Sequence, residues 1–288
     1  MAFPRFKSPA IESTFFAAYD AVLARWPVPV DSIDVPSGYG TTRVQVCGPA
    51  EGLPLVLLHG GMSTATVWFA NVADLSVTHR VYAVDQIGDV GRSVHDGQPI
   101  RSVDDFMAWL DGLLAHLRLT QAALCGHSYG AWLALNYTLH SPGRVGKLIL
   151  LDPTTCFAGL NFSYRIHAIP LFARPSAQRV RAFLHWETDG AALDPAWLAL
   201  AALAGGEARG SKLIVAKRPA EGRLRASTVP TLVVLAQNSK AHDASQVAAN
   251  ALRLMPRAST ATLTGATHHT MPTLGAPALN RTMLDFLA

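Results

Sequence analysis

The pentapeptide Gly126-His127-Ser128-Tyr129-Gly130 stands between an apolar run at residues 122–125 and an amphipathic run at residues 131–137. A strand, a sharp turn with serine at its apex and a helix together form a nucleophile elbow, whose strained turn lifts the hydroxyl out of the sheet. Gly126 and Gly130 fit this interpretation, because strand and helix crowd each other there and a side chain at either position would clash. A structural Gly-Ser turn is the alternative, and the flanking strand and helix favour the elbow.

Strand-like and helix-like segments alternate on both sides of this elbow. Strand patterns stand at residues 32–35, 42–47, 54–58, 81–84, 122–125, 147–151, 230–236 and 259–264. Apolar residues at helical spacing mark residues 12–26, 106–117, 245–254 and 279–287. Several of the strands are continuously apolar, as strands buried in a parallel sheet are. This order predicts an α/β fold with a mostly parallel, doubly wound sheet.

The alternation breaks between residues 155 and 228. Residues 213–215 are the single possible buried strand there, whereas residues 180–186 and 196–203 have helical spacing. We therefore expect a core of residues 1–155 and 229–288 and a helical cap, or lid, of residues 156–228. We expect the cap to lie over the carboxyl ends of the strands, where sites of α/β sheets are found.

The composition limits the class of protein. The chain has 288 residues, of which 50% are hydrophobic and 15% charged, enough for a sizeable core. No run is long and apolar enough to span a bilayer, and the N-terminal residues lack the apolar core of a signal peptide. The cysteines at positions 47, 125 and 156 are predicted to be buried free thiols in a reducing cytoplasm. A net charge of +4 is no argument for a nucleic-acid partner. Taken together, these observations predict a cytoplasmic protein without nucleic-acid or membrane partners.

Four motifs, in this order, resemble those of the α/β-hydrolase superfamily and more closely those of its small bacterial carboxylesterases. They are His59-Gly60-Gly61; Asp85 through Gly88 with Gly91 and Ser93; the elbow; and Gly265 with His268 three residues later. The similarity covers nearly the whole chain and is thinnest in residues 156–228. The motifs are specific for the fold and much less specific for the substrate.

The resemblance implies that Ser128 is a nucleophile, that His268 is its general base and that no cofactor is needed. It also implies an oxyanion hole made by the backbone N–H groups of Gly61 and Tyr129. A serine hydroxyl is a poor nucleophile until a base takes its proton, and the oxyanion then needs preorganised donors. His269 is a rival base, but the motif spacing favours His268. A metal bound by the paired histidines is not expected, because no carboxylate or cysteine stands at ligand spacing.

The acid of the expected triad departs from the family pattern. In most of the superfamily it follows the strand matched here by residues 232–235, where this chain has Ser239 instead of a carboxylate. Asp152, which ends the strand after the elbow helix, is the preferred acid, and haloalkane dehalogenases can place theirs on this neighbouring strand. An apolar strand rarely ends in a buried, unpaired carboxylate, although an Asp-Pro turn is the simpler alternative. Asp243 is the alternative acid, with helix capping as its simpler role. Asp85 is expected to brace the loop near His59.

The expected cap carries ten basic residues against five acidic ones. This excess suits either a solvated face or a surface for an anionic substrate or an acidic carrier protein. Its large apolar residues either line an acyl pocket or form the core of the cap; they are Phe157, Leu160, Phe162, Tyr164, Ile169, Leu171, Phe172, Phe183 and Trp186.

The sequence thus predicts a serine hydrolase that cleaves a carboxylic ester, with thioesters and lactones as further substrates, through an acyl-enzyme on Ser128. The expected partner is a small-molecule ester or acyl compound, anionic or carrier-bound, and the expected assembly is a monomer or homodimer. Two alternatives remain. One is the same fold with changed chemistry, as in a lyase, cyclase or acyltransferase. The other is a non-catalytic ligand-binding protein.

Overall fold

The computed structural model describes residues 5–208 and 214–288. Leu213 lies outside the described residues, and Ile214 and Val215 belong to neither a helix nor a strand. The possible strand at residues 213–215 is therefore not seen in its described part. Two basic residues of the expected cap, Arg209 and Lys212, also lie outside the described residues.

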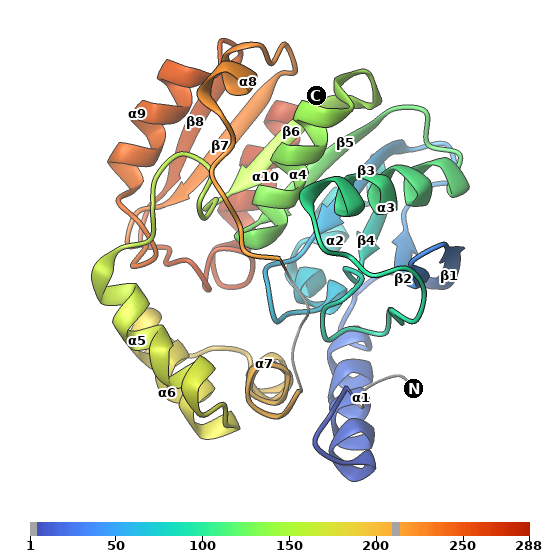
Figure 1. Ribbon diagram of the computed structural model, residues 1–288, viewed down its shortest axis with the longest axis vertical. Coiled ribbons are helices and arrows are strands. Elements are labelled where there is room, and N and C mark those ends of the chain that lie inside the picture. Colours follow the sequence, from blue (N-terminus) through green and yellow to red (C-terminus); the bar gives the residue numbers. More distant parts are fainter. Residues whose placement is uncertain (1–4, 209–213) are drawn as a thin grey trace.

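The described residues form an eight-stranded sheet in the order β1-β2-β4-β3-β5-β6-β7-β8 (Figure 1). The strands are β1 (Asp31–Ser37), β2 (Gly40–Cys47), β3 (Leu53–Leu58), β4 (His79–Val84), β5 (Ala122–His127), β6 (Val145–Leu151), β7 (Thr231–Ala236) and β8 (Ala258–Leu263). Pairing is antiparallel from β1 to β2 and from β2 to β4, and parallel at every other junction. The predicted mostly parallel sheet is confirmed.

Helices cover both faces of this sheet and form two hydrophobic clusters. The helices are α1 (Pro9–Leu23), α2 (Val72–Leu75), α3 (Val103–His116), α4 (Tyr129–His140), α5 (Phe162–Ala173), α6 (Ala177–Glu187), α7 (Pro195–Glu207), α8 (Glu221–Arg225), α9 (Ala244–Leu254) and α10 (Ala276–Leu287). One cluster joins the sheet to α3, α4, α8 and α9. The other joins it to α1, α2, α6, α7 and α10. The sheet is therefore wound on both faces, as its alternating sequence predicts.

Local sequence explains where the helices begin. At α3, Ser102 accepts a hydrogen bond from the backbone of Asp105, whose carboxylate binds the backbone of Ser102 in return. Such a capping box satisfies donors that the first helical turn leaves unpaired. Helix α1 begins three residues before the predicted position 12, because Ser8 caps it and Pro9 occupies its first position.

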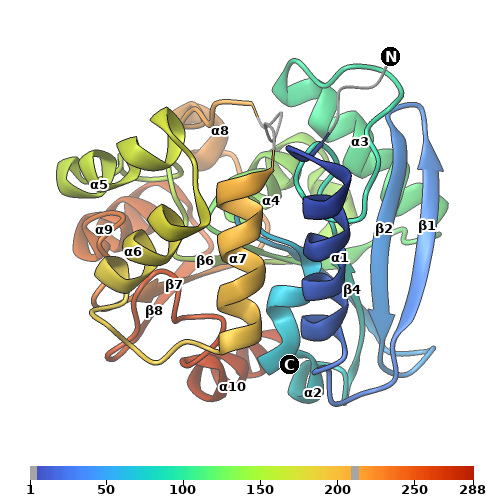
Figure 2. The same cartoon turned by 90° about the horizontal axis from the view of Figure 1, so that it is seen from below.

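Helices α5, α6, α7 and α8 lie between β6 and β7 in the chain, where the sequence predicts the cap. Figure 2 shows α7 between α6 and α1, and α7 packs against both of them. The division into a core and a cap stays a prediction.

Three of the large apolar side chains expected in an acyl pocket or a cap core, Phe162, Ile169 and Phe172, are exposed instead. The three cysteines are buried and free, as predicted. Among the described residues, no helix is long and apolar enough to cross a membrane.

Candidate active site

Ser128 sits between the last residue of β5 and the first residue of α4, with φ 55° and ψ −116°. Non-glycine residues rarely adopt this conformation, so it persists only because the surroundings enforce it. A Cβ on Gly126 would lie 2.1 Å from the carbonyl oxygen of Gly130, and a Cβ on Gly130 would lie 2.2 Å from that of Leu58. The crowding of strand and helix that the sequence predicts at the elbow is therefore present.

Asp152 comes directly after β6, which pairs with β5 on one side and β7 on the other. Parallel strands end at the same edge of a sheet, so the residues after β5 and β6 are neighbours. Two backbone hydrogen bonds hold this edge: Ser128 N–H donates to the carbonyl of Leu151 at 3.0 Å, and Asp152 N–H donates to that of Val234 at 2.8 Å.

The imidazole of His268 bridges Ser128 and Asp152. Its Nδ1 lies 2.6 Å from Oδ2 of Asp152, and its Nε2 lies 2.9 Å from Oγ of Ser128. A carboxylate can only accept, so Nδ1–H donates to Asp152, and Nε2 is left to accept from the serine hydroxyl. Asp243 is not part of this arrangement, since its carboxylate caps α9 by accepting from Gln246 N–H at 3.0 Å.

The backbone of His268 is also held by hydrogen bonds. Its N–H donates to Oε1 of Glu187 at 3.0 Å, and its carbonyl oxygen accepts from Nε2 of His127 at 3.0 Å. Burial, and then the charges of His268 and His269, lower the pKa of His127 well below 6.5, so His127 is neutral with the proton on Nε2. The residue before the elbow serine thus positions the loop that carries the histidine.

The carboxylate of Asp152 is fully buried and surrounded by donors. Besides His268, it accepts from the hydroxyl of Ser239 at 2.6 Å and from the backbone N–H of Ala236 at 3.0 Å. Nε2 of His242 lies 3.4 Å from Oδ1 of Asp152, the oxygen that accepts from Ala236. Burial raises the pKa of Asp152, but the hydrogen bond and charge of His268, the charge of His242 and the Ser239 hydroxyl outweigh it and lower the pKa well below 3.8. Ser239, at the usual acid position of the superfamily, binds the carboxylate of Asp152.

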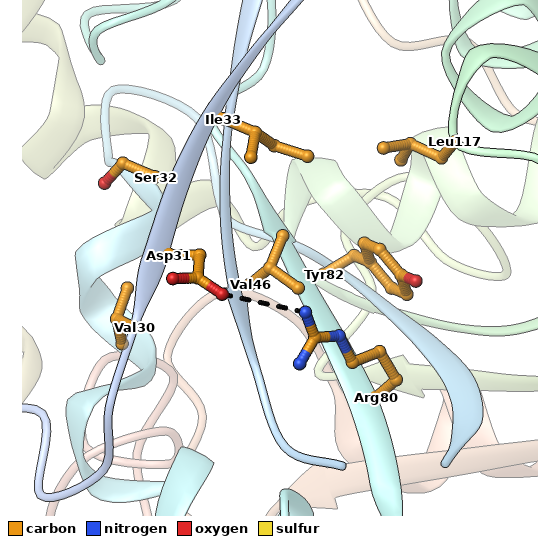
Figure 3. A pocket seen from close by; sticks show the side chains of 8 residues that line it. All are labelled: Val30, Asp31, Ser32, Ile33, Val46, Arg80, Tyr82 and Leu117. Atoms are coloured by element: carbon orange, nitrogen blue, oxygen red, sulfur yellow. Dashed lines mark ion pairs between the residues drawn. The ribbon is translucent and has the colours of Figure 1, made fainter. Parts of the chain in front are cut away.

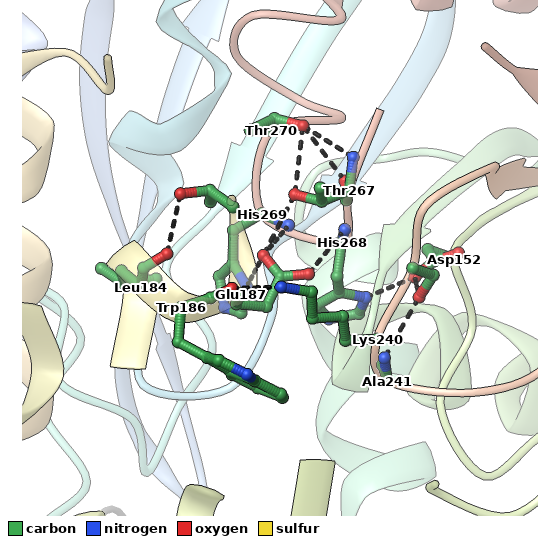
Figure 4. Close-up of polar contacts among 12 residues, drawn as sticks. Asp152, Leu184, Trp186, Glu187, Lys240, Ala241, Thr267, His268, His269 and Thr270 are labelled. Carbon is green, nitrogen blue, oxygen red and sulfur yellow. Dashed lines mark hydrogen bonds and ion pairs between the residues drawn. The ribbon is translucent and has the colours of Figure 1, made fainter. Parts of the chain in front are cut away.

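Glu187, the last residue of α6, is a site residue that the sequence analysis missed (Figure 4). Its buried carboxylate accepts from the backbone N–H groups of His268 and His269, from Nδ1 of His269 at 3.0 Å and from Oγ1 of Thr267 at 3.1 Å. Burial raises the pKa of Glu187, but the charge and hydrogen bonds of His269 and the charge of His268 outweigh it and lower the pKa to about 2. His269, the rival base, thus binds Glu187.

A sequence signal for Glu187 did exist. It follows Val180, Phe183 and Leu184 at helical spacing and so continues the apolar face of α6, where an acid is buried only when it is paired. The end of α6 is also tied to the loop of Ser239, because Nζ of Lys240 binds the carbonyl of Trp186 and, at 2.6 Å, the carboxylate of Asp189. One helix end therefore contacts the loops on both sides of the site.

The loop after β3 passes beside the elbow. A Cβ on Gly60 would lie 3.3 Å from Cβ of Ser128, so Gly61 follows a residue in near contact with the serine. Tyr129 is the first residue of α4, and the first N–H groups of a helix have no acceptor within the helix. Asp85 accepts from Ala65 N–H at 2.7 Å and from the Tyr19 hydroxyl at 2.9 Å, which braces the end of this loop.

A separate hollow of about 610 Å³ lies over β1, β2 and β4 (Figure 3). Asp31 and Arg80 form an ion pair of 3.8 Å in its wall. Three strands separate β1 from β5, and none of the residues around Ser128 lines the hollow, so we assign it no part in the site. Within residues 5–208 and 214–288, no group of three His, Cys, Asp or Glu side chains is arranged to hold a metal ion.

Comparison with known proteins gives three kinds of match. The sequence model described as "Alpha/beta hydrolase family" matches residues 55–279. The chain is 32% identical to the "Uncharacterized carboxylesterase nap" of Bacillus subtilis over 172 residues, which is 60% of this chain and 56% of the relative. It is 31% identical to "Carboxylesterase YbfK" of the same organism over 181 residues, or 62% of this chain and 60% of the relative. Less than two thirds of either relative is thus aligned.

The structural comparison covers more of both chains than the sequence alignments do. The crystal structure of naproxen esterase (carboxylesterase NP) from Bacillus subtilis superposes with a TM-score of 0.88 at 26% identity, over 97% of this chain and 99% of that one.

Proposed function

The chain belongs to the alpha/beta hydrolase family and has its fold, and from this membership and the geometry around Ser128 we propose that it is a carboxylic ester hydrolase. The observation that carries the proposal is the hydrogen-bonded chain from Ser128 through His268 to Asp152. The carboxylesterase names of its relatives agree with this activity. Nothing in the proposal requires a cofactor.

In the proposed reaction, Oγ of Ser128 attacks the ester carbonyl while Nε2 of His268 takes its proton. The backbone N–H groups of Gly61 and Tyr129 stabilise the oxyanion, and each such donor is typically worth about 3–4 kcal/mol. The tetrahedral intermediate collapses, the C–O bond to the alcohol breaks, and His268 returns the proton to the leaving oxygen. Water, deprotonated by the same imidazole, then cleaves the acyl-enzyme to give the acid and free Ser128.

Asp152 has the role of the acid in this proposal. Its carboxylate keeps the proton of His268 on Nδ1, which leaves Nε2 free to accept, and it stabilises the imidazolium that forms during attack. Burial lowers the pKa of His268, but the hydrogen bond and charge of Asp152 and the charge of Glu187 outweigh it and raise the pKa above 6.5. The imidazole is therefore a stronger base than a free histidine side chain.

Residues 156–228 are proposed as the cap that sets specificity. The supporting observation is that α6 reaches the site through Glu187 and that the ring of Tyr164, on α5, lies 6.2 Å from that of His268. We propose small-molecule esters as substrates, with thioesters and lactones as further acyl donors, because each presents a carbonyl that a serine can attack. A cytoplasmic location and a monomeric or dimeric state stay predictions.

Hydrolysis of p-nitrophenyl acetate and butyrate by the wild type and by Ser128→Ala tests the proposal. We expect the wild type to be active, Ser128→Ala to be inactive and an organophosphonate to add covalently to Ser128, as detected by mass spectrometry. If Ser128→Ala kept much of the wild-type activity, the lyase, cyclase or acyltransferase alternative would hold. If the wild type neither turned over esters nor reacted with the phosphonate, a ligand-binding protein would be the better conclusion.

A further inference from the structure

Helix α5 presents large apolar side chains to solvent. Phe162 and Phe172 are each 73% exposed, Ile169 is 59% exposed and Ile166 is 46% exposed. None of the residues of α5 is buried. At spacings of three and four residues, these side chains gather on one side of the helix. We call Phe162, Ile166, Ile169 and Phe172 the α5 outer face.

The other side of α5 is already packed. Tyr164, Ala168 and Leu171 contact the second hydrophobic cluster. The imidazole of His167 stacks on the Trp186 ring of α6 with 3.8 Å between centroids. In both overall views α5 lies at the outer edge of the molecule (Figures 1 and 2). Helix α5 therefore has two apolar surfaces, of which one packs against the protein and the other, the α5 outer face, is exposed. Contiguous exposed apolar side chains mark interaction sites, so this face needs an explanation.

The charged residues of the stretch that contains α5 have one sign. Residues 153–186 contain four arginines and no aspartate or glutamate. Arg165, Arg174 and Arg181 are exposed, and none of them forms an ion pair within residues 5–208 and 214–288. Exposed phenylalanines and isoleucines flanked by unpaired arginines match a helix that lies in the interface plane of an anionic membrane.

We propose that the α5 outer face docks the protein on an anionic lipid surface. A second copy is a poorer occupant, because a twofold contact would bring the arginines of two identical faces together with no carboxylate between them. A stable interface also buries about 800 Å² on each partner, more than four side chains supply. The expectation that no membrane is a partner came from the lack of a spanning run, which does not bear on a helix lying flat in the interface.

Docking through α5 has a consequence for the substrate, and this consequence rests on the proposed esterase function. The ring of Tyr164, on the inner side of α5, contacts the ring of His268, so only the thickness of α5 separates the outer face from the site. A docked enzyme would hold Ser128 close to the lipid surface and favour esters carried in it. The docking itself does not depend on catalysis.

Co-sedimentation with lipid vesicles tests the docking. The wild type and Ser128→Ala are mixed with vesicles of phosphatidylcholine alone or with one third phosphatidylglycerol. We expect binding to the anionic vesicles that weakens as salt is raised. A Phe162→Ser/Phe172→Ser double variant should bind about tenfold more weakly or worse, since it loses most of the insertable apolar area. An Arg165→Gln/Arg181→Gln variant should lose binding to the anionic vesicles specifically.

The matched control is Val77→Ser/Leu252→Ser, which removes side chains that are 73% and 52% exposed elsewhere on the surface and should bind like the wild type. Equal binding by the α5 and control variants, or no binding by the wild type, overturns the proposal. So does a concentration-dependent dimer in sedimentation velocity that the α5 variant abolishes, because the occupant is then a second copy. A protein that cleaves p-nitrophenyl butyrate but ignores vesicles refutes the docking alone, and one that binds vesicles without esterase activity refutes the esterase alone.

Discussion

Replacing Glu187 with glutamine tests whether α6 holds the histidine loop through charge. The change keeps the side-chain shape but removes an anion that accepts from two backbone N–H groups, one imidazole and one hydroxyl. A pKa lowered from 4.5 to about 2 corresponds to about 3 kcal/mol of folding free energy at neutral pH. Because glutamine accepts through one oxygen only, we expect Glu187→Gln to lose about that much stability at pH 7.

The pH dependence of this loss has a definite sign. A carboxyl whose pKa is lowered on folding stabilises the protein above its unfolded pKa, and the stabilisation disappears as the pH falls through the folded pKa. The stability difference between wild type and Glu187→Gln should therefore be full above about pH 5 and shrink as the pH falls towards 2. It should vanish only below about pH 2, where Glu187 of the folded protein is itself protonated. Urea unfolding at a series of pH values, followed by fluorescence, measures it.

Glu221→Gln is the matched control, because Glu221 is also the partner of basic side chains but is exposed at the surface. Its stability should stay close to that of the wild type, since exposed ion pairs contribute little. We also expect Glu187→Gln to lower kcat for p-nitrophenyl butyrate, because His268 loses the anion that holds its backbone. A stability loss below about 1 kcal/mol, or one that does not change with pH, would refute the reasoning.

Three further predictions concern the acid, the base and the elbow. Asp152→Asn should lower kcat/KM for p-nitrophenyl esters by about 10³–10⁴. Ser239→Asp should also lower kcat/KM, because a second anion would face the buried carboxylate of Asp152. A gain in kcat/KM on Ser239→Asp would contradict the assignment of Asp152 as the acid. The raised pKa of His268 should put the acid limb of kcat/KM above pH 6.5, because only the neutral imidazole accepts a proton, and Asp152→Asn should shift any residual limb to lower pH in stopped-flow titrations. Gly130→Ala should be strongly destabilised, because a Cβ there would clash with carbonyl oxygens of β3 and of the loop after it. Gly112→Ala in α3, which has open space around it, should gain up to about 1 kcal/mol of stability, measured by thermal unfolding.

The fold and the elbow at Ser128 could be predicted because their signals are local. Continuous apolar runs identify buried strands, and the two glycines around Ser128 indicate where a strand and a helix crowd each other. The order of these segments along the chain then leaves few topologies to choose from. The capped start of α1 was placed three residues late, because apolar spacing marks the buried face and not the cap.

The surroundings of the site depended on contacts between residues far apart in sequence. Asp152 was preferred from the sequence, but its place beside His268 depends on β6 pairing between β5 and β7, and its stabilisation by Ser239 depends on a loop more than eighty residues away. Glu187 is one of the five acidic residues of the expected cap, and only the packing of α6 against the loop of His268 shows that it is buried.

The sequence by itself determined the elements, their order and the chemical identity of the serine and the histidine, because each of these is written in a short pattern. Only the tertiary structure decided which carboxylate meets the imidazole, what holds the histidine loop and which side of α5 stays exposed. These outcomes follow from which buried surfaces meet when the sheet closes, and a one-dimensional pattern of apolar and polar residues does not specify that meeting.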